Sequence, residues 1–119
     1  MKPKKKTPKP KTCPDHGGTL TVARTQYGRR WSCPVRGCTV VCWEGSGTSR
    51  PADAETRQLR HAAHEAFDPM WESGAMSRSA AYRALAEHLG LPVRKTHIGF
   101  FNKDECAKAI AFAQEWLAR

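Results

Sequence analysis

Four side chains in the first third of the chain have the types and the spacing of ligands for one metal ion. Cys13 and His16 are separated by two residues, and Cys33 and Cys38 are separated by four. Zn²⁺ prefers four tetrahedral nitrogen or sulfur ligands, and two short turns can each deliver two of them. Because this set leaves no open position for water, it predicts one structural Zn²⁺ and not a catalytic ion.

Cys42 is the alternative to His16 as the fourth ligand. It follows Cys38 by four residues and lies in the apolar stretch VVCW. We interpret it as a small buried side chain, which leaves a Cys₃His site. A network of disulfides is disfavoured, because the five cysteines are odd in number and no secretory signal is visible.

The segments around these ligands have the β-branched, alternating pattern that is typical of strands. Three short strands are expected over residues 19–25, 30–33 and 39–43, with a turn at 26–29. Few large apolar side chains lie here, so metal binding is expected to supply much of the folding free energy. The pattern predicts a zinc ribbon over residues 13–50.

The net charge of +9 is concentrated in the first part of the chain. Residues 1–12 contain six lysines, three prolines and no acid. Such a segment cannot offset the entropy of ordering it, so we expect a disordered basic tail. The tail would bind phosphates without sequence preference, or would only aid solubility. Its predicted nucleic-acid contacts are Lys4, Lys5, Lys6, Lys9 and Lys11.

The predicted ribbon adds further candidate contacts to nucleic acid. Its arginines outnumber its acids, and its aromatic side chains are of the kind that stacks on bases. The alternative is that the aromatic side chains pack onto the helices. The candidates are Arg24, Arg29, Arg30, Arg36 and Trp31, with Tyr27 and Trp43 as further aromatic residues.

Residues 51–119 have equal numbers of acidic and basic residues and are expected to be helical. Three helices are expected, over residues 51–67, 78–89 and 102–117. Ser77 would cap the second helix, and Asn102 with Glu105 would cap the third. The third helix is expected to turn Cys106, Ile110, Ala113 and Leu117 inward. The predicted fold is α+β: a small three-stranded zinc ribbon packed with a three-helix C-terminal part.

One group in the helical part is a candidate for catalysis. His61, His64 and Asp68 share one helix face, and His97 could approach them. A second metal site or a nuclease-like acid–base cluster is one interpretation. Packing and hydrogen bonding around Trp71 is the favoured one.

A second group is a candidate for contacts to phosphates. Arg78, Arg83, Arg94 and Lys95 lie on a short helix and the loop after it, loosely in the manner of a helix-turn-helix. Because the acids of this part of the chain dilute the positive field, a solvated helix surface is the favoured interpretation.

Several segments together carry a resemblance to a known family. They are CPDHG, WSCPVRGC, RPADAETRQLRHAAHEAFDPMW, MSRSAAYRALAEHLG and HIGFFNKDEC, and they cover roughly residues 13–113. The sequence resembles the small zinc-finger-containing domain family of bacteriophages and bacteria, a family of unknown function. Its members usually have two Cys-x-x-Cys pairs and a cysteine downstream. The resemblance implies Cys13, His16, Cys33 and Cys38 as ligands, Cys42 as the extra cysteine, and a phage or prophage context. His16 and the longer second turn depart from the pattern.

We therefore predict a zinc-binding, non-enzymatic accessory protein of phage type that binds DNA or RNA. The alternatives are a protein-interaction adaptor that modulates a host protein machine, and a metal-assisted nuclease. The sequence has no apolar run near the roughly 20 residues of a membrane span, so we expect no membrane partner and a cytoplasmic location. The sequence makes no prediction of oligomeric state.

Overall fold

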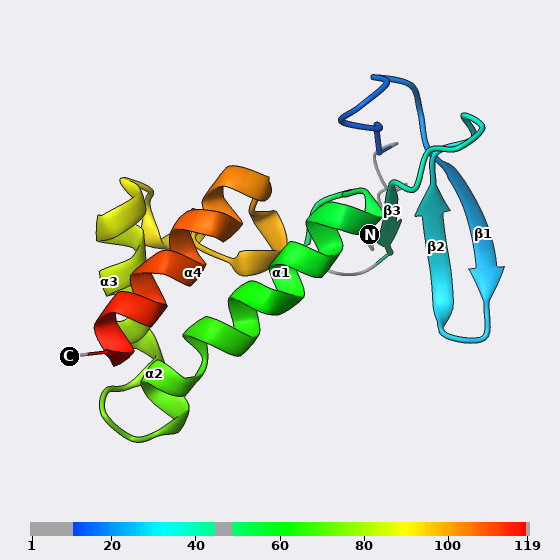
Figure 1. Cartoon of the computed structure of the whole chain (residues 1–119). Coiled ribbons are helices and arrows are strands. Elements are labelled where there is room, and N and C mark those ends of the chain that lie inside the picture. Colours follow the sequence, from blue (N-terminus) through cyan, green and yellow to red (C-terminus); the bar gives the residue numbers. More distant parts are fainter. Residues whose placement is uncertain (1–10, 45–48, 119) are drawn as a thin grey trace, which may run out of the picture.

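The computed structural model describes residues 11–44 and 49–118, and it has a small β-sheet beside a group of helices (Figure 1). Most of the predicted basic tail, residues 1–10, lies outside the described residues. The amide of Leu20 donates to the carbonyl of Lys11 at 2.8 Å, and Thr12 forms an antiparallel bridge with Thr19. The predicted tail boundary at residue 12 therefore falls inside a bridge.

Three antiparallel strands form the sheet, as the sequence predicts, and their order in the sheet is β1–β2–β3. They span Thr21–Thr25 (β1), Gly28–Ser32 (β2) and Val41–Trp43 (β3). A two-residue turn of Gln26 and Tyr27 joins β1 to β2. Gly28 follows this turn with a φ of 114°, a backbone conformation that residues with a Cβ rarely adopt.

One face of the sheet is turned inward. Trp31 of β2 is paired with Cys42 of β3, and cross-strand partners share a face. Cys42 is buried, and Trp31 packs against a small buried cluster. The cluster consists of Cys13, Leu20 and Val40. The metal-ligand region and this inner face therefore share one small core.

The opposite face of the sheet is turned outward. Arg30 of β2 is paired with Ala23 of β1 and with Trp43 of β3. Because successive residues of a strand point to opposite faces, this row lies on the side away from Trp31. Trp43 is 39% exposed, and Arg30 is also exposed. We call this side, centred on Ala23, Arg30 and Trp43, the open face.

The C-terminal part contains four helices, three of which are the predicted ones. The side chain of Ser77 accepts from the amide of Ala80, and Asn102 and Glu105 form a reciprocal capping box. The fourth is a short helix that begins at Pro69, a residue suited to a first helical turn because that turn does not use its amide hydrogens. The helices are α1 (Ala54–Phe67), α2 (Pro69–Glu72), α3 (Arg78–Leu89) and α4 (Lys103–Leu117).

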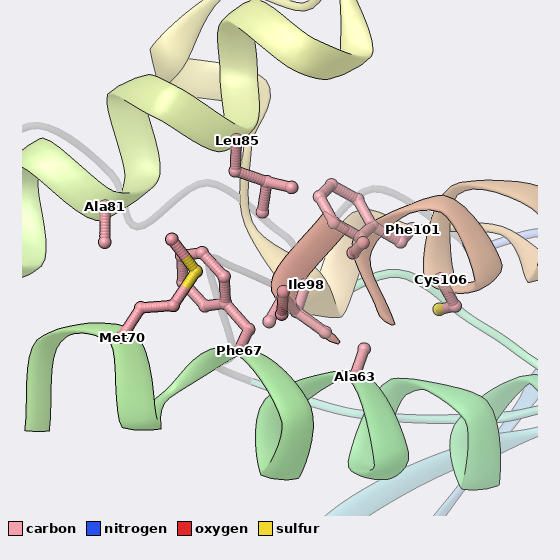
Figure 2. Packing of buried hydrophobic residues seen from close by; sticks show 10 residues of the cluster. Ala63, Phe67, Met70, Ala81, Leu85, Ile98, Phe101 and Cys106 are labelled. Atoms are coloured by element: carbon pink, nitrogen blue, oxygen red, sulfur yellow. The ribbon is translucent and has the colours of Figure 1, made fainter. Parts of the chain in front are cut away.

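The main core lies between these helices. Two 3₁₀ turns, η1 (Val93–Lys95) and η2 (Ile98–Phe100), connect α3 to α4. Figure 2 shows the buried side chains of Phe67 and Met70 directed toward Leu85. The prediction for α4 is partly wrong, because Leu117 in its last turn is 45% exposed while Ala109 is buried. The inward face of α4 runs through Cys106, Ala109, Ala113 and Trp116, so Leu117 lies outside it.

Hydrogen bonds to backbone carbonyls join the sheet to the helices. Val41 of β3 forms an antiparallel bridge with Ala52, which precedes α1. Arg60 of α1 donates from Nε to the carbonyl of Phe101 and from Nη1 to the carbonyl of Arg50, each at 2.8 Å. One guanidinium thus fixes the segment before α1 to the segment before α4. Among the described residues, none of the helices is both long and apolar enough to cross a membrane.

Candidate metal centre

A tight turn presents the first two predicted ligands. The amide of Gly17 donates to the carbonyl of Cys13 at 2.7 Å, and the amide of Cys13 donates to the carbonyl of Gly18 at 2.8 Å. Gly17 has a φ of 73°, in the left-handed region that favours glycine. The two glycines after His16 are therefore part of what folds CPDH into a turn that brings both ligands to one side.

A longer turn presents the other two ligands. The amide of Cys38 donates to the carbonyl of Val35 at 3.0 Å, and the amide of Cys33 donates to the carbonyl of Val40 at 3.1 Å. Gly37, directly before Cys38, has a φ of 84°. This left-handed residue lets the chain accommodate four residues between the ligands where two are more common.

The four ligand atoms converge on one point, within 4.8 Å of one another. The Sγ of Cys13 lies 3.5 Å from Nδ1 of His16 and 3.7 Å from Sγ of Cys38. The Sγ of Cys33 lies 3.7 Å from Nδ1 of His16. With Zn–S of about 2.3 Å and Zn–N of about 2.0 Å, a tetrahedral site has edges of roughly 3.8 Å between sulfurs and 3.5 Å between sulfur and nitrogen. The four side chains are therefore placed to bind one Zn²⁺, as predicted, with His16 bound through Nδ1.

The electrostatics of the site favour a bound cation. Burial raises the pKa of the Cys13 thiol, but hydrogen bonds from His16 and from two backbone amides outweigh burial and lower this pKa to about 7. For Cys38, a hydrogen bond from the Val40 amide lowers the pKa, while burial and two neighbouring thiols raise it to about 11. Sulfurs this close repel one another as thiolates, and a metal ion removes that repulsion when it displaces their protons.

Cys42 is not one of the converging ligands. It is 3% exposed and lies on β3, with Sγ 3.7 Å from the carbonyl oxygen of Trp43 and 4.0 Å from that of Ser49. Because the side chain is directed to the inner face of the sheet, it cannot replace His16 without a change of register. The interpretation of Cys42 as a small buried side chain is confirmed.

The candidate catalytic group of α1 does not assemble. Nε2 of His61 lies 3.0 Å from the carboxylate of Glu65, and Nδ1 of His64 lies 3.3 Å from the carboxylate of Asp68. The ring of His97 packs edge-on against Phe100, with ring centroids 5.2 Å apart. Each histidine has a partner of its own, and within residues 11–44 and 49–118 the Cys₃His group is the one cluster fit to hold a metal ion. These contacts favour the packing interpretation over the nuclease.

The predicted nucleic-acid contacts differ in how available they are. Lys4, Lys5, Lys6 and Lys9 lie outside the described residues, while Arg24, Arg29, Arg30 and Arg36 are exposed. Nη1 of Arg29 lies 3.6 Å from Glu44. Trp31 is half-buried, and its indole nitrogen is buried without a hydrogen-bond partner in the described part of the chain.

Trp31 and Trp43 are both candidate contacts in the sequence, and Trp43 is the one of the two that is exposed on the open face. The signal that could have identified it is the neighbouring residue, Cys42, interpreted from the sequence as buried. If Cys42 points inward, the next residue of the strand points outward.

Comparisons with known proteins agree with this geometry. The model of a family described as a zinc-finger-containing domain matches residues 11–116. This range includes the four ligands, the sheet and the helices. No curated protein and no solved structure matches the chain.

Proposed function

The chain belongs to the family of zinc-finger-containing domains, and we propose that it is a non-enzymatic accessory protein that binds single-stranded nucleic acid on the open face of its sheet. In this proposal the zinc ion has a structural role, and contacts to bases and phosphates come from side chains of the strands. The phage-type context and the cytoplasmic location stay predictions.

The composition of the open face carries the proposal. Arg30 lies between Ala23 and Trp43 in one cross-strand row, so a guanidinium and an indole ring are neighbours on an exposed surface. An unpaired base can stack on such a ring, while the guanidinium binds the adjacent phosphate. The other residues of the three strands on this face are uncharged, so nothing there repels a polyanion.

Exposed basic side chains elsewhere on the ribbon add positive charge, although Arg24 pairs with Arg29 and so lies on the side of the sheet opposite to the open face. Arg24 and Arg36 are exposed, and neither takes part in an ion pair within residues 11–44 and 49–118. Tyr27, in the turn between β1 and β2, is 78% exposed and offers a second aromatic surface. The positive charge of the ribbon and its exposed aromatic rings suit the backbone and the bases of a single strand.

Zinc supports the proposed function indirectly. The core under the sheet has three fully buried residues, whereas the core of the helical part has ten. So small a core does not fix three strands by itself, and the metal supplies the remaining stability. The proposal therefore requires that binding be lost when zinc is removed.

The test is binding of the zinc-loaded protein to labelled single-stranded and duplex DNA and RNA over a salt series, measured by fluorescence anisotropy. Trp43→Ala should weaken single-strand binding by about 5- to 150-fold, the equivalent of one stacked base. Arg30→Gln should lower the slope of log K against log salt by about 0.7, the value for one phosphate contact.

Lys108→Gln is the matched control, because it removes the same charge from the exposed surface of α4, where Lys108 pairs with Asp104. It should leave binding nearly unchanged. Equal effects of Lys108→Gln and Arg30→Gln would contradict the proposal, as would wild-type affinity in Trp43→Ala. A protein without residues 1–10 should still prefer single strands, since the tail adds affinity but no stacking.

The protein-interaction adaptor is the second candidate, and one observation favours it. β1 lies at an edge of the sheet, with β2 as its one neighbour among the described strands. An extended peptide could pair with the outer edge of residues 21–25 by strand addition. If deletion of residues 1–10 removed all nucleic-acid binding, that result would favour this candidate.

A further inference from the structure

The helical part contains a cavity of about 470 Å³ between α3 and η1. Its walls come from the first two turns of α3 and from residues 93–97. Three of the side chains that line it are basic: Arg78, Arg83 and His97. Three more carry hydroxyl groups: Ser79, Tyr82 and Thr96. The volume lies in the range of small-molecule sites and exceeds what a single inorganic ion needs.

The charge of this cavity is one-sided. No carboxylate belongs to its lining, and neither Arg78 nor Arg83 takes part in an ion pair within residues 11–44 and 49–118. A cavity of similar size, about 480 Å³, lies beside the first ligand turn and mixes both signs. It is lined by the acids Asp15, Asp53, Asp104 and Glu105 together with Arg50, Arg60 and Lys103. Of these two cavities, the α3 cavity is the one whose lining suits an anion.

The walls of the α3 cavity are held in place by packing. The guanidinium of Arg78 lies 5.5 Å from the ring centre of Trp71 and 5.2 Å from that of Tyr82. The ring of Tyr82 packs edge-on against Phe67 at 4.9 Å. A guanidinium stacked in this way keeps its N–H donors at the edge, so a ligand meets it already oriented.

Two of the hydroxyl-bearing side chains, Thr96 and Tyr82, are also held by buried contacts. Thr96 is 1% exposed, and its Oγ1 donates to the carbonyl of Pro92 at 2.9 Å. Burial, together with the charge of Asp68, raises the pKa of Tyr82. The Tyr82 hydroxyl therefore stays protonated at neutral pH and can donate to an anion. The first turn of α3 contains no acidic residue, so its positive end is not neutralised there.

We propose that this cavity binds the phosphate group of a nucleotide, with Arg78, Arg83 and His97 around the phosphate. The ring of Tyr82 and the side chain of Val93 then provide an apolar surface beside the sugar and base. The phosphate could belong to a mononucleotide or to a nucleic-acid strand, because both offer the same group. This inference does not depend on binding at the open face, since the cavity is formed by α3 and η1 alone.

The test is an NMR titration of the zinc-loaded full chain with adenosine 5′-monophosphate, with adenosine as the probe that lacks a phosphate. Saturable shifts of backbone amides should be confined to residues 78–83 and 93–97, and adenosine should not produce them. Arg83→Gln should weaken binding by about tenfold or more, because a charge-assisted hydrogen bond is lost.

Arg94→Gln is the matched control, since Arg94 lies on η1 beside the cavity but does not line it. It should retain binding within about twofold, as expected for a screened, more distant charge. Equal losses in Arg83→Gln and Arg94→Gln would overturn the proposal, because they would indicate a diffuse field and not a site. Absence of localised shifts, or identical shifts with adenosine, would overturn it too.

A further arm distinguishes the two sources of the phosphate. An oligothymidylate of ten nucleotides is titrated into a Trp43→Ala background, in which the open face is impaired. Shifts of residues 78–83 at lower concentrations than the mononucleotide requires would identify a strand as the ligand. Shifts with the mononucleotide alone would identify a small nucleotide. Both outcomes support the cavity as a site, whatever the open face binds.

Discussion

Removal of zinc should unfold the ribbon and leave the helices folded. The perturbation is a strong chelator added to the full chain, with loss of the metal checked by atomic emission. The helical core contains ten fully buried residues, among them Phe67, Phe101 and Leu85, and needs no metal. The cluster beneath the sheet contains three, and one of these, Cys13, is itself a ligand.

The magnitude follows from the two aliphatic residues that remain in the small cluster. Full burial of Leu20 and Val40 contributes about 3–6 kcal/mol together, at about 1.5–3 kcal/mol each. A structural Zn²⁺ contributes about 10–16 kcal/mol at neutral pH. Because the bound metal contributes more free energy than the burial of these two side chains, the sheet should unfold when the metal is removed.

The assay is amide hydrogen exchange with and without chelator, supported by far-UV circular dichroism. Amides of β1, β2 and β3 should lose their protection, while those of α1, α3 and α4 keep theirs and the helical signal changes little. Protected strands in protein shown to lack metal would refute the reasoning about the small core. Melting of α1 with the strands would refute the division of the chain into two stability units.

Three further predictions concern single side chains. Cys42→Ala should leave the zinc content at one ion per chain, whereas Cys33→Ser should lower it, as measured by atomic emission. Arg60→Met should lower the free energy of unfolding by about 3–5 kcal/mol in urea titrations, because the carbonyls of two segments lose charge-assisted hydrogen bonds. Hydrogen bonding to Thr56 and the charge of Lys103 lower the pKa of Asp53, so its carboxylate adds stability above pH 4 that is lost as the pH falls through the lowered pKa. The stability advantage of the wild type over Asp53→Asn should therefore shrink as the pH falls below about 4, the ordinary pKa of an aspartate.

Features that depend on a few neighbouring residues could be predicted from the sequence. Ser77 and the pair Asn102 and Glu105 cap their helices through contacts three residues apart, and such contacts are visible in the sequence. The spacing of the four metal ligands is also local within each turn. Only their meeting across the sheet needs the tertiary fold.

Features that depend on distant packing could not be predicted. The outward side of Trp43 could have been inferred from its buried neighbour Cys42, but the inward side of Trp31 depends on its pairing with Cys42 across two strands. The exposure of Leu117 depends on which side of α4 faces the core: Trp116 packs against it and Leu117 does not, and the periodicity within α4 allows either. From the sequence, the basic residues of α3 are expected on a solvated helix surface. In the structure, η1 packs beside them and they line a cavity.

The distance between the open face and the α3 cavity sets a minimum length for any nucleic-acid strand that binds to both. Figure 1 shows the sheet and α3 at opposite ends of the molecule, with α1 running between them. α1 has 14 residues and a length of about 21 Å, which we take as the scale of the path between the two sites. At about 3.4 Å per stacked nucleotide, a strand that stays stacked needs roughly six nucleotides to cover this path. The affinity of oligonucleotides should therefore rise steeply beyond that length, since the second contact becomes intramolecular, and Arg83→Gln should abolish the rise while leaving short oligonucleotides unaffected. A gradual increase with length that Arg83→Gln does not change would mean that the two surfaces do not share a strand.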